Sequence, residues 1–389
     1  MINRILSDKL KYFAGLFPVV SLTGPRQSGK TTLVKAAFPG YTYYSLEDID
    51  IRNLAISDPK GFLSNNKQGL IIDEIQRVPE LFSYIQSIVD ESNVSGQFVI
   101  TGSQNFLLLE KISQSLAGRV AILKLLPLSL QELKSGGLLN YNFIEFIFNG
   151  FYPRIYDKKI PATGFYPFYI QTYIERDVKL IRNISNQNTF VRFLKMCAGR
   201  TGQILNVSDL ANACGISQVT AKSWLSVLEA SFVIYFLQPH YRNYNKRLVK
   251  MPKMYFYDTG VVCSLLGIKS EKQVQLHYLY GAIFENFIIN EMLKSAYNKA
   301  DVPAIYYWRD KTGREIDVII EKSDKLIPIE IKAGKTIVSD FFKNIKYWNK
   351  LSKNNKDNSY VIYGGDDNFS TKEGSLVSWR KLDLLLNLI

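Results

Sequence analysis

Short apolar runs alternate with helical stretches over the first 130 residues of the chain. Each run is almost continuously hydrophobic, which is typical of parallel strands buried on both faces. The pattern predicts an α/β fold, in which a parallel sheet has helices on both faces. The predicted strands are Val19–Thr23, Thr42–Ser45, Leu70–Asp73, Phe98–Thr101 and Ala121–Leu125, and the predicted helices include Thr31–Ala37 and Pro79–Asp90.

The pattern changes twice further along. Serine and glycine cluster between residues 134 and 140, as they do in connecting segments. Helical periodicity then dominates until a short β region near residue 260, and from Tyr280 a helix leads into strands and further α/β structure. A chain of 389 residues is too long for one ordinary core. We therefore predict three domains, at residues 1–135, 136–260 and 261–389.

Composition narrows the class of protein. The apolar fraction of 47% and the charged fraction of 21% are those of a soluble globular protein. The chain has no run of eighteen apolar residues and no signal-peptide core, so we expect it to be cytoplasmic. Its three cysteines are scattered, and His240 and His277 are its only histidines. A disulfide framework, a zinc site or a histidine-dependent triad is therefore not indicated.

Positive charge is concentrated in the middle of the chain. Residues 136–260 carry 15 basic and 7 acidic side chains, a net charge of +8, within a total of +13. Such a segment attracts an anionic partner. A basic, well-solvated surface without a partner would have the same composition.

A complete phosphate-binding motif stands between the first predicted strand and the first predicted helix. The segment GPRQSGKT fits G-x-x-x-x-G-K-[ST] without mismatch. Its glycines let backbone N–H groups surround phosphate oxygens. Lys30 would reach the β- and γ-phosphates of ATP, and the Thr31 hydroxyl would be a ligand to Mg²⁺. The predicted ATP-binding residues here are Gly24, Pro25, Arg26, Gln27, Ser28, Gly29, Lys30, Thr31 and Thr32.

The strand Leu70–Asp73 supplies the second half of this site. Asp73 at its carboxyl end could hold the magnesium ion, and Glu74 could polarise the water that attacks the γ-phosphate. An apolar run that ends in two acids is common by itself, and the preceding P-loop is what favours the functional interpretation. The expected activity is ATP hydrolysis, with ATP and Mg²⁺ as cofactors.

Two further positions could contact a nucleotide. Thr101 or Ser103, at the end of the fourth predicted strand, could sense the γ-phosphate, although turn chemistry also explains Thr-Gly-Ser. Arg119 follows a predicted helix and could act as an arginine finger, in its own chain or on a neighbouring subunit's nucleotide. A surface salt bridge explains a single arginine equally well.

These motifs together resemble a family of bacterial and archaeal AAA+ ATPases that have a C-terminal domain of unknown function. The resemblance implies a P-loop ATPase domain, a winged-helix segment and a C-terminal domain similar to restriction endonucleases. Arg176, in YIERDV, could be a second nucleotide sensor or an ion-pair partner of its neighbours. The matching segments are TGPRQSGKTTL (23–33), IIDEIQRVPEL (71–81), ITGSQ (100–104), SLAGRV (115–120), GFYPRI (150–155), YIERDV (173–178), KMYFYDTG (253–260) and GAIFENFIINEML (281–293).

Residues 206–250 read as a helix–turn–helix followed by a basic hairpin. The turn falls at Gly215, and Val219, Lys222 and Ser223 lie near the start of the second helix, where a recognition helix meets DNA. The segment 232–237 could be the first wing strand. Winged helices also dock proteins, so a protein partner stays open. The basic rim would consist of Arg242, Lys246, Arg247 and Lys250.

The C-terminal third contains a constellation of acids on a predicted hairpin. If Ser323 and the next residue form its tip, Asp317 lies directly across from Glu330, and Lys332 shares the face of Glu330. Glu285 on the preceding helix would add a third carboxylate. Such a group can hold Mg²⁺ for phosphodiester hydrolysis and is similar to the PD-(D/E)XK nuclease pattern. An inactive nuclease-like fold, kept for binding or assembly, would have the same residues.

Two functions follow from these observations. The first is an ATPase that couples ATP hydrolysis to DNA binding or processing. The second is a nucleotide-gated regulatory or assembly protein whose C-terminal half binds a protein partner. Either could form an oligomer, and neither calls for a membrane.

Overall fold

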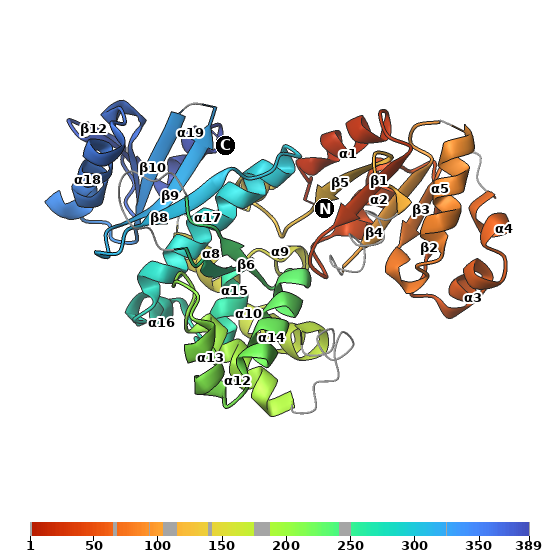
Figure 1. Ribbon diagram of the computed structural model, residues 1–389, viewed down its shortest axis with the longest axis horizontal. Coiled ribbons are helices and arrows are strands. Elements are labelled where there is room, and N and C mark those ends of the chain that lie inside the picture. Colours follow the sequence, from red (N-terminus) through yellow and green to blue (C-terminus); the bar gives the residue numbers. More distant parts are fainter. Residues whose placement is uncertain are drawn as a thin grey trace.

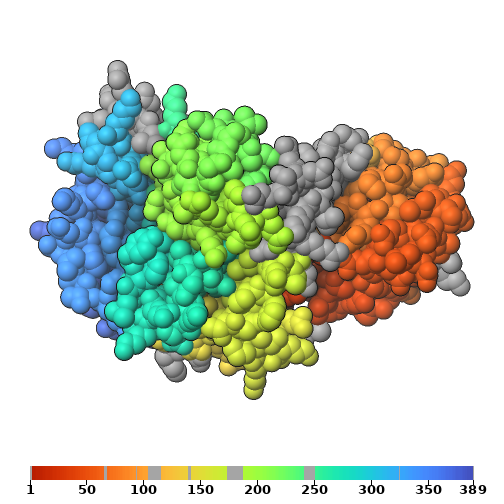
Figure 2. All heavy atoms as spheres, turned by 90° about the horizontal axis from the view of Figure 1, so that it is seen from below, coloured from red at the N-terminus to blue at the C-terminus, as the bar shows by residue number. Residues whose placement is uncertain are grey.

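The computed structural model describes residues 2–64, 68–92, 94–103, 115–138, 142–174, 187–240, 250–323 and 325–388. The molecule is elongated, with the N-terminal sheet at one end, the C-terminal sheet at the other and most of the middle helices below them (Figure 1). Seen from below, the N-terminal part is a lobe beside a larger body, in which the green and blue segments are in continuous contact (Figure 2).

The N-terminal part is a five-stranded parallel sheet with the order β2-β3-β4-β1-β5. β1 (Val19–Thr23), β2 (Thr42–Ser45) and β3 (Leu70–Asp73) have the predicted bounds. β4 (Phe98–Gly102) and β5 (Val120–Lys124) differ from the prediction by one residue. The predicted α/β sheet is confirmed. Its helices are α1 (Leu6–Ala14), α2 (Lys30–Ala37), α3 (Ile49–Ser57), α4 (Pro59–Ser64) and α5 (Leu81–Ser92).

The three inner strands of this sheet, β1, β3 and β4, are buried on both faces, which explains their nearly unbroken apolar runs. Val20 packs with Leu10 of α1 in the core on one face. Val19 packs with Ile85 of α5 in the core on the other face. Because all five strands run in the same direction, the carboxyl ends of β1 and β3 lie at one edge of the sheet, where α/β folds bind ligands.

The middle part contains the predicted helix–turn–helix. α13 (Val207–Cys214) and α14 (Gln218–Ala230) are joined at Gly215, whose φ of 67° is in the left-handed region. β6 (Ile234–Leu237) and β7 (Lys253–Phe256) form an antiparallel pair, so the strand predicted at residues 232–237 begins two residues later than expected; its role as a wing stays a prediction. The other helices of this part are α7 (Leu130–Ser135), α8 (Phe143–Asn149), α9 (Pro153–Asp157), α10 (Ala162–Tyr169), η2 (Ile170–Ile174), α12 (Gln187–Ala198), α15 (Thr259–Leu265) and α16 (Glu271–Leu276).

The C-terminal part is a six-stranded mixed sheet with the order β12-β13-β11-β10-β9-β8, preceded by the long helix α17 (Tyr280–Asn298). In the hairpin of β9 (Glu315–Lys322) and β10 (Lys325–Lys332), Val318 pairs with Ile329, which is the predicted register. The remaining elements include β8 (Ile305–Arg309), β11 (Tyr360–Tyr363), β12 (Phe369–Thr371), β13 (Gly374–Ser378), α18 (Lys343–Ser352) and α19 (Asp383–Leu386).

One hydrophobic core joins the middle and C-terminal parts. Its buried side chains come from both parts and include Phe284 and Ile288 of α17 as well as Trp379. The N-terminal sheet has two cores of its own. Among the described helices, none is long and apolar enough to cross a membrane.

Candidate functional site

The loop between β1 and α2 has the backbone conformation of a phosphate-binding loop. Gly24 has a φ of 150°, and a Cβ atom there would lie 2.1 Å from the carbonyl oxygen of Leu125. Gln27 and Gly29 have left-handed φ values of 60° and 95°. Gly29 is the N-cap of α2, so the N–H groups of the first helical turn face the end of the helix at which an anion binds.

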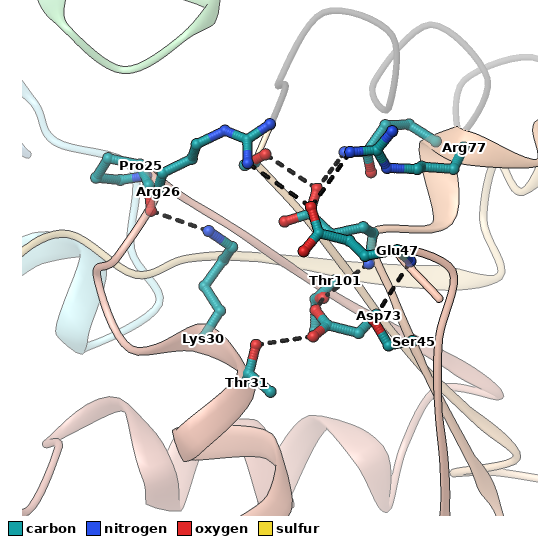
Figure 3. Close-up of polar contacts among 12 residues, drawn as sticks. Pro25, Arg26, Lys30, Thr31, Ser45, Glu47, Asp73, Arg77 and Thr101 are labelled. Atoms are coloured by element: carbon teal, nitrogen blue, oxygen red, sulfur yellow. Dashed lines mark hydrogen bonds and ion pairs between the residues drawn. The ribbon is translucent and has the colours of Figure 1, made fainter. Parts of the chain in front are cut away.

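Lys30 and Thr31 begin α2 beside the end of β3. Lys30 is buried, and its Nζ donates to the carbonyl oxygens of Gly24 and Pro25, each at 2.9 Å. Figure 3 shows Lys30 beside Pro25. Thr31 Oγ1 donates to Asp73 Oδ2 at 2.8 Å. The structure therefore brings together the two halves of the site that the sequence predicted from separate segments.

Asp73 accepts hydrogen bonds from three hydroxyl groups in this structure. In addition to Thr31, Tyr43 donates to its Oδ2 at 2.7 Å and Thr101 donates to its Oδ1. Burial and the neighbouring carboxylate raise the pKa of Tyr43 well above its ordinary value. Sequence reasoning missed Tyr43, since an aromatic residue in a short strand gives no sign of a bond to an acid.

Glu74 follows β3 with a left-handed φ of 57°, which is uncommon for a residue other than glycine. Its Oε2 accepts a hydrogen bond from Ser103 Oγ at 3.0 Å and another from Gln76. Ser103, predicted to sense the γ-phosphate, thus holds Glu74 here. Contact of Ser103 with a phosphate stays a prediction.

A cavity of about 1070 Å³ lies between the N-terminal sheet and the middle part. Pro153 and Arg154 of α9 line it opposite the P-loop. Pro153 Cγ is only 4.0 Å from where a Cβ atom on Gly29 would stand, so α9 lies directly over the loop. The lining residues include Arg4, Arg26, Gln27, Gly29, Lys30, Thr31, Thr32, Asp73 and Glu74. The volume suffices for a nucleotide.

Arg154 is a lining residue that sequence reasoning missed. Its side chain is exposed, and it has no ion-pair partner in the described part of the chain. Arg154 belongs to GFYPRI, one of the segments on which the family resemblance rests, but the resemblance gave this segment no role. On the other rim, Glu47 is 3.2 Å from Arg77 and 3.8 Å from Arg26 (Figure 3).

Of the two other predicted arginines, Arg119 does not line this cavity. Arg119 Nη2 donates to Asp90 Oδ2 at 3.0 Å, and both side chains are partly exposed. This is the surface ion pair that the sequence left open, and action on a neighbouring subunit stays a prediction. Arg176 lies outside the described residues.

The four residues predicted for a nuclease-like site lie together at the N-terminal half of α17. Lys332 contacts Glu330 and lies 3.8 Å from Asp317 Oδ2. Asp317 also accepts a hydrogen bond from the backbone of β10. Glu285 is close enough to both Lys332 and Asp317 for their charges to affect one another.

A lysine from the middle part also enters this cluster. Lys253 Nζ on β7 lies 3.0 Å from Glu285 Oε1 and also contacts Glu315. Tyr255, two residues further along β7, donates to Glu285. Lys253 was quoted only within KMYFYDTG, and nothing local shows that it meets acids from a later segment. The C-terminal charged cluster thus consists of Lys253, Glu285, Glu315, Asp317, Glu330 and Lys332.

Burial and like charge make two of these acids weak. Burial raises the pKa of Glu285 to about 7 and that of Glu330 to about 8, and Asp317 adds to both shifts. Lys253 opposes the shift of Glu285, as Lys332 opposes that of Glu330. Across the described ranges, no group of three or more His, Cys, Asp or Glu side chains is arranged to hold a metal ion.

The helix–turn–helix presents a solvent-facing surface at the start of α14. Val219 is 78% exposed, and Lys222 is exposed one turn later. Lys250 is exposed as well, whereas Arg242, Lys246 and Arg247 lie outside the described residues. DNA binding by residues 206–250 stays a prediction.

Comparison with family models divides the chain into three matches. Residues 16–134 match an AAA domain, residues 140–272 match a domain of unknown function (DUF8612), and residues 280–382 match another domain of unknown function (DUF4143). The first match contains the P-loop and Asp73. The chain is thus a P-loop protein of the AAA type.

Similar proteins are known in bacteria. An uncharacterized protein of Mycobacterium tuberculosis, Rv2008c, is 33% identical over 322 residues, which cover 82% of this chain and 71% of that protein. An uncharacterized protein of Haemophilus influenzae is 24% identical over 69% of this chain and 66% of its own.

Solved structures are more distant. The walker-type ATPase PABY2304 of Pyrococcus abyssi is 16% identical with a TM-score of 0.46, over 68% of this chain and 96% of its own. AMPPCP-bound DnaA from Aquifex aeolicus is 15% identical with a TM-score of 0.31, over 58% of this chain and 86% of its own. Scores below 0.5 do not establish a common fold over these lengths.

Proposed function

Because the chain belongs to the family of its mycobacterial relatives and carries an AAA domain, we propose that it is a Mg²⁺-dependent ATPase that couples ATP hydrolysis to DNA binding or processing. The observation that carries the ATPase proposal is the convergence of Lys30, Thr31, Asp73 and Glu74 on one cavity.

Each residue has a role that its position supports. Lys30 would exchange its bonds to the Gly24 and Pro25 carbonyls for phosphate oxygens, since a charged acceptor binds an ammonium more strongly than a neutral one. Glu74 would orient the attacking water, and Ser103 would fix the Glu74 carboxylate. Such positioning and charge stabilisation account for most catalysis of phosphoryl transfer.

Thr31 and Asp73 fit a magnesium ion. Both present oxygen atoms, which are the ligands that Mg²⁺ prefers, and these oxygens are 2.8 Å apart. Magnesium commonly takes only one or two protein ligands beside phosphates and waters, so a cluster of three acids is not needed. When bound, the ion would neutralise charge on the phosphate oxygens.

Replacing the two central residues tests hydrolysis. Lys30→Ala should lose binding of a slowly hydrolysed ATP analogue. Glu74→Gln should still bind the analogue but hydrolyse ATP roughly 10²–10⁴-fold more slowly, the usual contribution of a general base. Lys60→Ala, at an exposed lysine of α4, is the control. Normal hydrolysis by Lys30→Ala would refute the proposal.

DNA coupling is supported by the net charge of +8 between residues 136 and 260 and by the exposed start of α14. We expect DNA to raise the rate of ATP hydrolysis several-fold and DNA affinity to fall steeply with added salt. A DNA-binding curve that does not change between low and high salt would count against DNA binding by this segment.

The charged cluster favours a second candidate, a nucleotide-gated assembly protein with an inactive nuclease-like fold. Lys253, which is not part of the nuclease pattern, already neutralises carboxylates there. Metal-dependent nicking of plasmid or branched DNA that is lost in Asp317→Ala would support cleavage. No nicking and no stimulation by DNA, together with a stable protein partner, would favour assembly.

A further inference from the structure

Arg4 ties the P-loop to two other segments with a single guanidinium. Its Nη1 donates to the carbonyl oxygen of Ser28 at 2.6 Å, and its Nη2 donates to that of Leu126 at 2.6 Å. Its Nε donates to Glu132 Oε1 at 3.0 Å, and its side chain is only 8% exposed. Because the guanidinium is planar and rigid, these three acceptors are held in fixed relative positions.

Glu132 extends this arrangement into α7. It is fully buried, and its Oε2 accepts a hydrogen bond from Ser129 N at 2.9 Å to complete the capping box of the helix. The next residue, Leu130, donates its backbone N–H to Glu291 Oε2 of α17 at 2.7 Å. The start of α7 is therefore bonded to two acids. One is its own Glu132, which holds Arg4, and the other is Glu291 of α17.

Glu291 is itself fixed on α17. Its Oε1 accepts from Lys294 Nζ at 2.7 Å, and each residue is 1% exposed. Lys294 also lies 3.6 Å from the ring centroid of Phe151. Displacing one member of a buried pair leaves an uncompensated charge, which is strongly unfavourable. Glu285 of the charged cluster stands six residues earlier on the same helix, at a distance of about 9 Å along its axis.

We propose that Arg4 is a positioning residue of the nucleotide site and that Arg4, Glu132 and Glu291 couple the P-loop to α17. The proposal rests on nucleotide binding at the P-loop. Ser28 lies in the loop whose N–H groups would bind phosphate, so a shift of the loop changes the bonds of Arg4. Leaving a buried polar group without its partner costs free energy, so a shift of the loop should be accompanied by shifts of Glu132 and Glu291. By linkage, a change at Glu291 alters nucleotide affinity in return.

Titration of a fluorescent, slowly hydrolysed ATP analogue measures this coupling. Arg4→Lys keeps the charge but cannot donate to all three acceptors, and we expect it to weaken binding roughly tenfold. Glu291→Gln keeps an acceptor for Leu130 but removes the charge, and we expect a loss of roughly threefold. The double variant should lose less than the product of the two. Arg200→Lys, which alters a forked surface pair with Asp209, is the matched control and should bind normally.

Tryptophan fluorescence gives a second readout that a purely local role of Arg4 would not change. All 4 tryptophans lie between residues 224 and 379, outside the N-terminal sheet. Trp379 packs against Phe287 of α17, with ring centroids 6.4 Å apart. Saturating analogue should change the emission of the wild type, and the change should be smaller in Arg4→Lys and Glu291→Gln.

The outcomes separate the inference from the proposed function. If the wild type does not bind the analogue, nucleotide binding at the P-loop is refuted. If the wild type binds, but Arg4→Lys binds within twofold and shows the same emission change, the role of Arg4 is refuted. Should Arg4→Lys not fold, Glu291→Gln decides, because wild-type affinity and emission response in that variant would overturn the coupling.

Discussion

Replacing Lys253 by methionine would remove a buried positive charge while nearly conserving side-chain volume. Lys253 is 2% exposed and contacts Glu285 and Glu315. Burial alone would lower the pKa of Lys253, but Glu285, Glu315 and Asp317 outweigh burial and hold it above its ordinary value. The lysine is therefore charged at neutral pH, and the variant would leave its acidic partners without that charge.

The structure sets the size of the expected loss. Breaking a buried ion pair by removing one partner costs about 3–5 kcal/mol. Arg309 Nη1 stays 3.0 Å from Glu315 Oε2 and compensates that acid in part. Glu285 keeps the hydrogen bond from Tyr255 and the nearby charge of Lys332, so we expect the lower end of the range, about 3 kcal/mol. Since domains are stable by about 5–15 kcal/mol, this loss is easily measured.

The loss should depend on pH with a definite sign. The pKa of Glu285 is about 7 in the folded protein, above the ordinary value for a glutamate. A carboxyl with a raised folded pKa contributes stability that is complete below its unfolded pKa and disappears as pH rises through its folded pKa. Lys253 lowers the pKa of Glu285, so the variant raises it further. The deficit should therefore be smallest near pH 5, where Glu285 is protonated in both proteins, and largest near pH 8.

Urea unfolding followed by tryptophan fluorescence measures this difference. Because all 4 tryptophans lie between residues 224 and 379, the signal reports on the body that contains Lys253. Lys250→Met, the same substitution at an exposed lysine three residues earlier, is the control. Equal stability of Lys253→Met and the wild type at pH 8, or an equal deficit at pH 5 and pH 8, would refute the reasoning.

Three further predictions concern the nucleotide site and the helix–turn–helix. Gly24→Ala should prevent ATP binding and lower the thermal midpoint of unfolding, because its Cβ would meet a backbone carbonyl at 2.1 Å; normal binding would contradict the loop geometry. Arg154→Ala should weaken ATP binding roughly tenfold in an equilibrium titration, whereas Lys159→Ala, an exposed lysine outside the cavity lining, should not. Lys222→Glu should weaken DNA binding and reduce the slope of affinity against salt in a filter-binding series without changing basal ATP hydrolysis; an unchanged slope would place DNA elsewhere.

Local geometry explains which parts of the nucleotide site could be predicted. Lys30 and Thr31 belong to an eight-residue motif whose function follows from its own backbone conformation. Asp73 ends a strand with a clear apolar pattern, so its place at the sheet edge follows from strand direction. Tyr43 and Arg154 reach the site through strand pairing and through the packing of α9. Neither contact leaves a periodic pattern in the sequence.

In the charged cluster, too, only the contacts set by local geometry could be predicted from the sequence. Asp317 and Glu330 could be placed opposite each other because a short hairpin fixes its own register. Lys253 meets Glu285 only because β7 and α17 share one core, and a contact over that sequence distance has no local signal. The hairpin acids therefore belong to a cluster that also contains a buried lysine, and metal binding there stays a prediction.

The position of the nucleotide cavity bears on how ATP could act on the rest of the chain. One wall belongs to a sheet with its own cores, and the other belongs to α9 in the body that contains α17. A ligand shifts an equilibrium between two arrangements only if it binds them with different affinity. ATP that contacts both Lys30 and Arg154 meets this condition, because its contacts with Arg154 depend on the distance between the two bodies, whereas those with Lys30 do not. Hydrolysis would weaken the contacts to the transferred phosphate. The first structural change should therefore occur where α9 contacts the P-loop.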